Sequence, residues 1–314
     1  MASSETALTS ARPEDPGLAR VEVAKLPSGI EIAHESFGDP GDPTILLVMG
    51  LGMQMLGWDE DFCELLAARG FRVIRYDNRD VGLSTKVGRG APNVLAGAVG
   101  LRSAAYRLAD MAVDAVGLLD HLEVDGAHVV GASMGGMIAQ TLAARHAERT
   151  LSLCSIMSGP GGRAVSTMPR MSVIGTLLAR PPSGREAYAE HVATLFERIG
   201  SPGFKHDHER LRRRALLSYD RCFHPAGAAR QLMAIMASGN RTAEIRRIRC
   251  PTLIVHGRAD KLMPAAAGRA VASAIPGARL ELFDGMGHDL PAELWPRFAE
   301  LIAANASRAG YSTA

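Results

Sequence analysis

The chain has 314 residues, of which 47% are hydrophobic and 22% charged, and its formal net charge is +2. This composition is typical of a globular protein with a large core, and it excludes a disordered or fibrous chain. The small net charge and the two short basic clusters, Arg212-Arg213-Arg214 and Arg246-Arg247-Ile248-Arg249, argue against a nucleic-acid partner, so we expect these arginines on solvated helix faces.

Residues 1–19 are rich in Ser, Thr, Ala, Glu and Pro and lack the features of a secretory signal, which predicts a mobile tail. No apolar run reaches the ~18 residues that a membrane span requires. The four cysteines are scattered without CxxC spacing, which favours free thiols over a disulfide or zinc framework. We therefore predict a cytoplasmic protein, and no pattern in the chain indicates an oligomeric state.

Predicted strands and helices alternate along most of the chain. Two short strands at 21–25 and 30–36 flank the turn Leu26-Pro27-Ser28-Gly29 and predict a hairpin at the edge of a sheet. From residue 44 onward, apolar runs typical of strands buried on both faces alternate with segments of helical periodicity. We expect further strands at 44–49, 71–76, 127–132, 150–157, 252–256 and 279–283, and helices at 59–69, 108–122, 134–146, from 265 and from 291.

This alternation is interrupted once. Gly159-Pro160-Gly161-Gly162 opens about 85 residues of helical pattern before the strands resume. We predict an α/β core domain formed by residues 20–159 and 249–314, with a mostly parallel central sheet flanked by helices. Residues 160–248 are predicted to form an inserted helical lid.

The segment Gly131-Ala132-Ser133-Met134-Gly135 fits the pattern G-x-S-x-G between a predicted strand and a predicted helix. In this context a tight, strained turn exposes the serine hydroxyl at the carboxyl end of the sheet, and it requires tiny neighbours such as these glycines. We predict that Ser133 is a nucleophile and that the amide of Met134 donates to a substrate oxyanion. The alternative is a glycine-rich turn with an inert serine.

A serine nucleophile needs a base, and in this kind of fold its partners follow in the order Ser, acid, His. Asp260 ends a turn after one predicted strand, and His288 lies in a flexible turn after the next. We predict Asp260 as the acid and His288 as the base. A turn or N-cap role is the alternative for Asp260. Asp289 is the competing acid, although Leu290-Pro291 indicates that it caps the final helix.

The second oxyanion donor is expected in the loop after the strand at 44–49, and we assign it to the amide of Leu51 between two glycines, with a plain turn as the alternative. His128 and His256 are expected to pack within strands. His206 and His208 lie on a segment that we expect to be exposed rather than metal-binding. No metal is therefore predicted. No cofactor is predicted either, because the glycine-rich segment 131–136 fits neither nucleotide-binding motif.

These residues resemble the α/β-hydrolase family over nearly the whole chain. The elbow, the segment from Gly257 to Asp260 and Gly287-His288 carry the likeness, and residues 77–84 resemble the family loop D-x-R-G-x-G-x-S with Asp80 in place of a glycine. Met49-Gly50 replaces the common His-Gly and is similar to a bacterial carboxylesterase and aclacinomycin methylesterase-like subgroup. The resemblance implies an α/β-hydrolase fold with a Ser-His-Asp triad.

We therefore expect hydrolysis of a carboxylic ester of an apolar small molecule through an acyl-enzyme. A thioesterase, lactonase or carbon-carbon bond hydrolase would use the same triad, and a small-molecule receptor is the alternative outside enzymes. Bulky apolar acyl groups should bind better than acetate, and charged substrates poorly. We assign substrate binding to Met157, Met168, Met171, Met233 and Met236.

Overall fold

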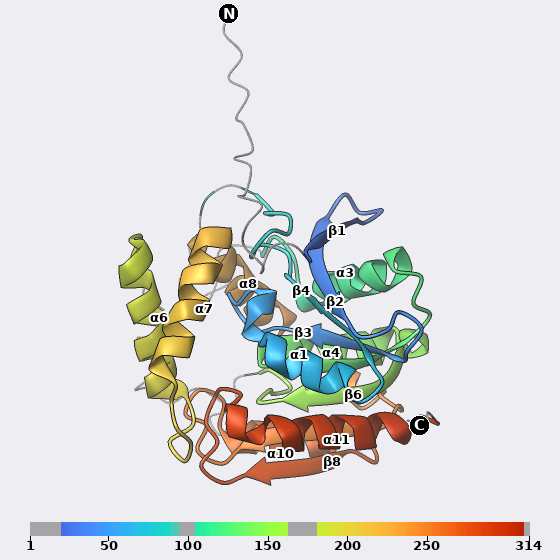
Figure 1. Ribbon diagram of the computed structural model, residues 1–314. Helices are drawn as coiled ribbons and strands as arrows, with labels where there is room; N and C mark the ends of the chain where they lie inside the picture. Colours follow the sequence, from blue (N-terminus) through green and yellow to red (C-terminus); the bar gives the residue numbers. More distant parts are fainter. Residues whose placement is uncertain are drawn as a thin grey trace, which may run out of the picture.

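The computed structural model describes residues 20–88, 90, 92, 94, 104–162 and 181–310. At its centre is an eight-stranded sheet with the order β1-β2-β4-β3-β5-β6-β7-β8 (Figure 1). β2 runs antiparallel to both of its neighbours, and the strands from β4 to β8 pair in parallel, so the predicted edge hairpin and mostly parallel sheet are confirmed. The strands are β1 (Glu22–Lys25), β2 (Glu31–Phe37), β3 (Thr44–Val48), β4 (Arg72–Tyr76), β5 (Ala127–Ala132), β6 (Thr150–Ile156), β7 (Thr252–Gly257) and β8 (Arg279–Phe283).

Helices cover both faces of this sheet. α1 and α11 pack together on one face, while α3, α4 and α10 lie on the other. The final helix begins later than predicted, because a short 3-10 turn at Ala292–Leu294 precedes it. The helices are α1 (Glu60–Ala67), α3 (Leu108–His121), α4 (Met134–Arg145), α6 (Arg185–Ile199), α7 (His208–Arg221), α8 (Pro225–Ser238), α9 (Thr242–Ile245), α10 (Ala265–Ala274) and α11 (Trp295–Ser307), with further 3-10 turns at Met55–Gly57 and Ala147–Arg149.

The hydrophobic core is divided into two halves by the sheet. Along β3, Leu46 and Val48 pack with the side chains of α3 and α4, whereas Ile45 and Leu47 pack with those of α1 and α11. All four side chains are fully buried. A strand with apolar contacts on both faces has no polar alternation, which explains the continuous apolar run in the sequence.

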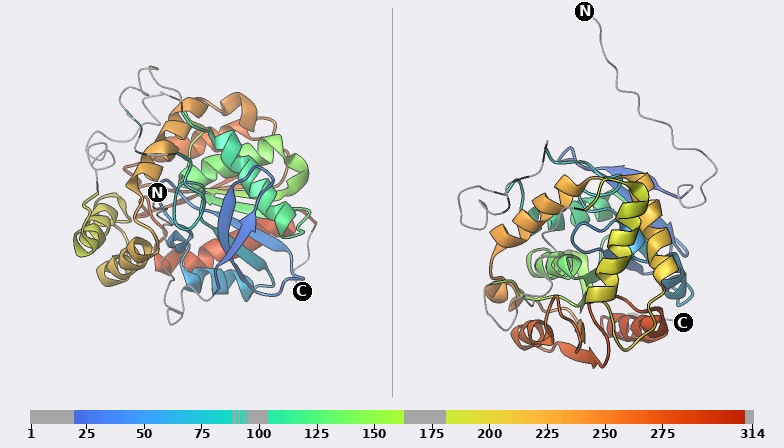
Figure 2. Two further views of the ribbon diagram at one scale, coloured as in Figure 1. Left: turned by 90° about the horizontal axis from the view of Figure 1, so that it is seen from above. Right: turned by 90° about the vertical axis from the view of Figure 1, so that its left-hand side faces the viewer.

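The helices α6, α7, α8 and α9 lie between β6 and β7 in the chain. α6 and α7 stand side by side at the end of the sheet toward which the arrows of β6 and β8 point (Figures 1 and 2). α8 packs against α3, and its Ala234 belongs to the same core cluster as Ile245 and Ile248. The second half of the predicted insertion therefore contributes side chains to the main core.

Two further features concern the hydropathy of the helices and the cysteines in the described part of the chain. No described helix has the length and hydropathy of a membrane span. Cys63, Cys154, Cys222 and Cys250 are all free thiols. Burial raises the pKa of the Cys63 thiol to about 12, so this sulfur stays protonated and packs as a small apolar group.

Candidate active site

Ser133 occupies a strained turn between β5 and α4. Its φ of 56° lies in the left-handed region, which a non-glycine residue adopts at a cost of about 1–3 kcal/mol. The turn is closed by glycines: a Cβ on Gly131 would lie 2.2 Å from the carbonyl oxygen of Gly135, and one on Gly135 would lie 2.0 Å from that of Val48. The predicted strand-to-helix elbow is therefore present, and only glycine fits two residues before and two residues after Ser133.

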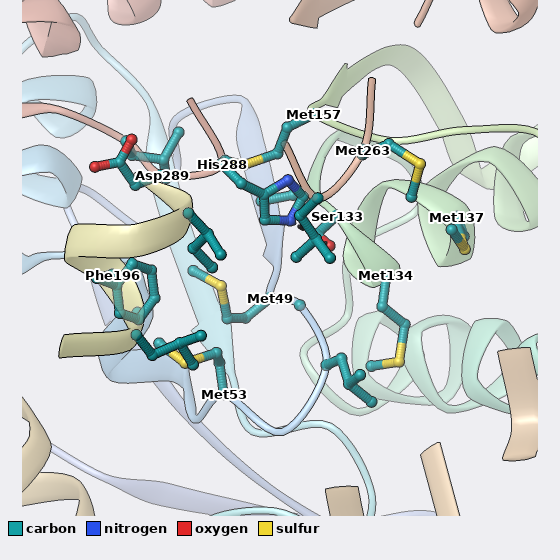
Figure 3. Close-up of a pocket in the computed structure, with 18 of the residues that line it drawn as sticks. Met49, Met53, Ser133, Met134, Met137, Met157, Phe196, Met263, His288 and Asp289 are labelled. Atoms are coloured by element: carbon teal, nitrogen blue, oxygen red, sulfur yellow. Dashed lines mark hydrogen bonds between the residues drawn. The ribbon is translucent and has the colours of Figure 1, made fainter. Parts of the chain in front are cut away.

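The side chains of Ser133, His288 and Asp260 form one chain of hydrogen bonds at the carboxyl ends of β5, β7 and β8. His288 Nε2 lies 2.9 Å from Ser133 Oγ, and His288 Nδ1 lies 2.7 Å from Asp260 Oδ2. Figure 3 shows the imidazole of His288 beside Ser133 in the cavity. The structure thus brings together three predicted residues that are separated by up to 155 positions in the chain.

Asp260 is buried, yet its environment favours the carboxylate. Burial alone would raise the pKa, but the charge of His288 and the hydrogen bonds from nearby donors lower the pKa of Asp260 to about 2. Its second oxygen, Oδ1, accepts the amides of Leu262 at 2.9 Å and Met263 at 2.7 Å. The carboxylate is therefore held in place from both sides, and its remaining oxygen is directed at the imidazole.

His256 is packed within strand β7, as the sequence predicted, but its position directly behind Asp260 was not foreseen. The ring is fully buried, and its Nε2 lies 2.7 Å from the carbonyl oxygen of Met263 and 3.6 Å from Asp260 Oδ2. Since a carbonyl oxygen only accepts, Nε2 carries the proton. The absence of a side chain on Gly268 makes room for the ring, because a Cβ there would come within 2.5 Å of Nδ1. The only sequence feature that could have suggested this contact is the spacing of four residues between His256 and Asp260.

Asp289 does not cap the final helix, which corrects the sequence interpretation. The N-cap of the 3-10 turn is Pro291 and that of α11 is Leu294. The carboxyl of Asp289 instead accepts a hydrogen bond from the hydroxyl of Ser201. Burial raises the pKa of Asp289, in contrast to that of Asp260. The preference for Asp260 as the partner of His288 agrees with this geometry.

The loop after β3 lies against Ser133. A Cβ on Gly50 would lie 3.3 Å from the Cβ of Ser133, so the backbone of this loop closely approaches the serine. The amides of Leu51 and Met134 donate to no acceptor within the described ranges. Both amides are therefore free to donate to a ligand, and their role as oxyanion donors stays a prediction.

Gln231 of α8 holds this loop, and the sequence interpretation did not single it out. Its side chain is fully buried. Oε1 accepts the amide of Gly52 at 2.8 Å, and Nε2 donates to the carbonyl oxygen of Arg79 at 2.8 Å. One glutamine therefore connects α8 to the loop after β3 and to the segment after β4.

Ser133 and His288 open into a cavity of about 1110 Å³. Of the methionines assigned to substrate binding, Met157, Met233 and Met236 line it, whereas Met168 and Met171 lie outside the described residues. Sulfur-containing side chains from the core surround the same space (Figure 3). These further methionines, which the sequence did not place there, are Met49, Met53, Met134, Met137 and Met263.

Charged side chains gather in one part of the cavity wall, which also contains Phe196 of α6. Asp59, Arg210 and Arg214 line the cavity together with His206 and Asp289. In the described part of the chain, no group of three or more His, Cys, Asp or Glu side chains has the arrangement of a metal site.

A central, mostly parallel sheet with a serine elbow and a histidine at its carboxyl edge defines the α/β hydrolases as a class. Comparison with known proteins places the chain there. Residues 43–293 match the model of the alpha/beta hydrolase fold family, and the chain belongs to that family. It is therefore an enzyme of the α/β-hydrolase type.

The chain is similar to two bacterial methylesterases. Rhodomycin D methylesterase of Streptomyces peucetius is 30% identical over 294 residues, which cover 88% of this chain and 95% of the relative. The rhodomycin D methylesterase of Streptomyces sp. strain C5 is 31% identical over 294 residues, which again cover 88% of this chain and 95% of the relative. Among solved structures, an enol-lactonase from Burkholderia xenovorans superposes with a TM-score of 0.71 at 23% identity, covering 91% of this chain and all of that one, and this likeness supports the fold.

Proposed function

We propose that this enzyme is a serine esterase that hydrolyses the methyl ester of a large, mainly apolar acid. The observation that carries the proposal is the hydrogen-bonded chain from Ser133 Oγ through His288 to Asp260, which opens into a large cavity. The similarity to two methylesterases over most of their length supports a small alcohol as the leaving group.

In the first half of the reaction, Ser133 Oγ attacks the ester carbonyl carbon while His288 Nε2 takes the hydroxyl proton. Asp260 accepts from Nδ1–H, which fixes the tautomer that leaves Nε2 free to act as a base. The carbonyl oxygen becomes negatively charged and accepts hydrogen bonds from the amides of Leu51 and Met134. The tetrahedral intermediate collapses, the alkoxide takes the proton from His288 and leaves as the alcohol, and the acyl group stays on Ser133.

In the second half, a water molecule attacks the acyl-enzyme. His288 takes a proton from that water, hydroxide adds to the carbonyl carbon, and the same two amides receive the oxyanion. Collapse then breaks the bond to Ser133 Oγ, which recovers its proton from His288. The acid is released, and the enzyme returns to its starting state without a cofactor.

The size and lining of the cavity favour a bulky acyl group. Pockets for small ligands commonly measure about 300–1,000 Å³, so a cavity of about 1110 Å³ accommodates a substrate much larger than acetate. Methionine side chains adapt their shape to apolar ligands of irregular outline. We assign the acyl group to this methionine-lined space and the methoxy group to the region next to His288.

Two further assignments complete the proposal. α6 and α7, within the predicted insertion 160–248, form a lid over the cavity, since both helices contribute lining residues. The free state of all four cysteines supports a reducing, cytoplasmic location.

The function is tested by measuring initial rates with methyl, ethyl and butyl esters of one bulky aromatic acid. The proposal predicts the highest kcat/KM for the methyl ester and a loss of turnover in Ser133→Ala. If the matching thioester or lactone were cleaved efficiently while all three esters resisted, the assignment of an ester substrate would be wrong.

A further inference from the structure

Arg214 of α7 lines the same cavity as Ser133, although its sequence context predicted a solvated face. The three arginines of the cluster have different surroundings. Arg212 forms an ion pair with Glu186, and Arg213 is exposed. Arg214 is only partly exposed and lines the cavity wall. The triplet therefore does not act as one basic patch.

Within the described residues, the guanidinium of Arg214 has neither a hydrogen bond nor an ion pair. Its neighbour in the cavity wall is Phe196, with the guanidinium carbon 6.0 Å from the ring centroid. A contact of this kind stabilises the charge but leaves all five N–H donors available. Arg214 is half-buried, and its donors face the cavity rather than a protein acceptor, so a ligand in the cavity can reach them.

The carboxyl groups nearest to Arg214 are already engaged. Asp59 receives two hydrogen bonds from Arg210, at 2.6 and 2.9 Å, and also caps α1 by accepting the amide of Asp61. Asp289 accepts from Ser201, and burial raises its pKa, which favours the neutral form. Both acids favour the charge of Arg214 from a distance, but neither forms an ion pair with it.

Burial lowers the pKa of Arg214, which means that the surroundings disfavour its charge. An arginine nonetheless keeps its proton at neutral pH. The cavity wall therefore contains a half-buried guanidinium that has no ion-pair partner among the described residues. A ligand oxygen with a negative charge would supply both the missing charge and the missing acceptors, in a planar geometry that matches the guanidinium.

We propose that Arg214 is a substrate-binding residue that receives an anionic oxygen, such as a carboxylate, carried by the acyl group at a distance from the ester. This rests on the proposed esterase function and names its substrates more closely: half-esters of acids that keep a second acidic group. It also revises the expectation that charged substrates bind poorly, since one negative charge has a place in the cavity.

The test uses monomethyl esters of α,ω-dicarboxylic acids of increasing length, each compared with the ester-amide in which a neutral carboxamide replaces the free carboxylate. The measured quantity is the ratio of kcat/KM for the acid to kcat/KM for the amide at neutral pH. We expect the wild-type ratio to exceed one at some chain length and to fall about tenfold or more in Arg214→Gln. Arg214→Lys should keep part of the preference.

Arg213→Gln is the matched control, since it removes the same charge from the adjacent, exposed position and should leave the ratio unchanged. Melting temperatures of the variants show whether each one folds, and Arg214→Met gives a second way to remove the charge. A wild-type ratio at or below one for every length, or a preference that persists in Arg214→Gln and Arg214→Met, would overturn the proposal. Cleavage of the ester-amides is a separate readout: if the wild type cleaves none of them and none of the half-esters, the esterase function itself fails.

Discussion

Gln231 accepts the amide proton of Gly52 at 2.8 Å and thereby ties helix α8 to the loop that carries the proposed oxyanion donor Leu51. The Gln231 side chain is fully buried, and this bond is one of two that it makes. Because the position of an oxyanion donor decides how strongly it stabilises the transition state, this contact matters for catalysis although Gln231 does not touch the reacting atoms.

We predict that Gln231→Ala lowers kcat by about ten- to a hundredfold and changes KM little, since the loop would lose its anchor. Gln140→Ala is the matched control. Gln140 is equally buried and also makes two side-chain hydrogen bonds, to Ser155 and Arg241, but it does not contact this loop. Steady-state kinetics and melting temperatures of both variants are required. Equal losses of kcat in the two variants would mean that Gln231 has only a structural role.

The acid of the triad is tested by comparing two neighbouring candidates. Asp260→Asn should reduce kcat by a factor on the order of 10⁴, because the imidazole of His288 would be held in the wrong tautomer. Asp289→Asn should keep most of the activity, since Asp289 bonds to Ser201. If Asp289→Asn removed activity while Asp260→Asn did not, the two roles would have to be exchanged.

Asp260 also predicts a pH dependence of stability. Its pKa is about 2 in the folded protein, below the ordinary 3.8. A carboxyl whose pKa is lowered by folding adds stability above its unfolded pKa and loses that contribution as the pH falls through the folded pKa. The contribution is about 2 kcal/mol and is lost between roughly pH 4 and pH 2.

The measurement is the free energy of unfolding by urea for the wild type and Asp260→Asn, at pH 5 and at pH 2.5. The difference between the two proteins should shrink at the lower pH, because the Asp260 carboxyl of the unfolded chain is protonated there while that of the folded protein is still mostly ionised, and the asparagine does not titrate. A difference that stays constant over this range would contradict the lowered pKa.

The methionine-lined cavity predicts that kcat/KM rises with the apolar size of the acyl group. Each buried methylene contributes up to about 0.8 kcal/mol, or about a fourfold gain, until the cavity is filled. A series of methyl esters from acetate to a bulky aromatic acid tests this, with Met233→Trp as a variant whose narrower cavity should shift the optimum to smaller acids. A flat or falling series in the wild type would show that the cavity does not hold the acyl group.

The sequence predicted the sheet and the serine elbow because both depend on local patterns. A strand such as β3 is apolar on both faces, and the elbow needs Gly131 and Gly135 whatever lies further along the chain. His288 and Asp260 could be assigned because each follows a predicted strand, and parallel strands bring their carboxyl ends to one edge.

Arg214 and Gln231 could not be placed in this way. Both lie on helices of the segment between β6 and β7, where the direction of each side chain depends on how the helix is packed and not on its own periodicity. Arg214 is next to the exposed Arg213 in the sequence, and nothing local distinguishes the two. The predicted capping role of Asp289 was wrong because its actual partner, Ser201, is 88 residues away in the sequence.

The central claim is that Ser133 forms the covalent acyl-enzyme. Its most direct test is reaction of the folded protein with a fluorophosphonate, followed by mass spectrometry of the digested product, with Ser133→Ala and Ser158→Ala treated in parallel. Ser158 is a buried serine whose hydroxyl donates to the carbonyl oxygen of Ser133, so it is a nearby control. We predict one phosphonyl group on Ser133 in the wild type and in Ser158→Ala, and none in Ser133→Ala. An adduct on another residue, or undiminished labelling and ester hydrolysis in folded Ser133→Ala, would contradict the account.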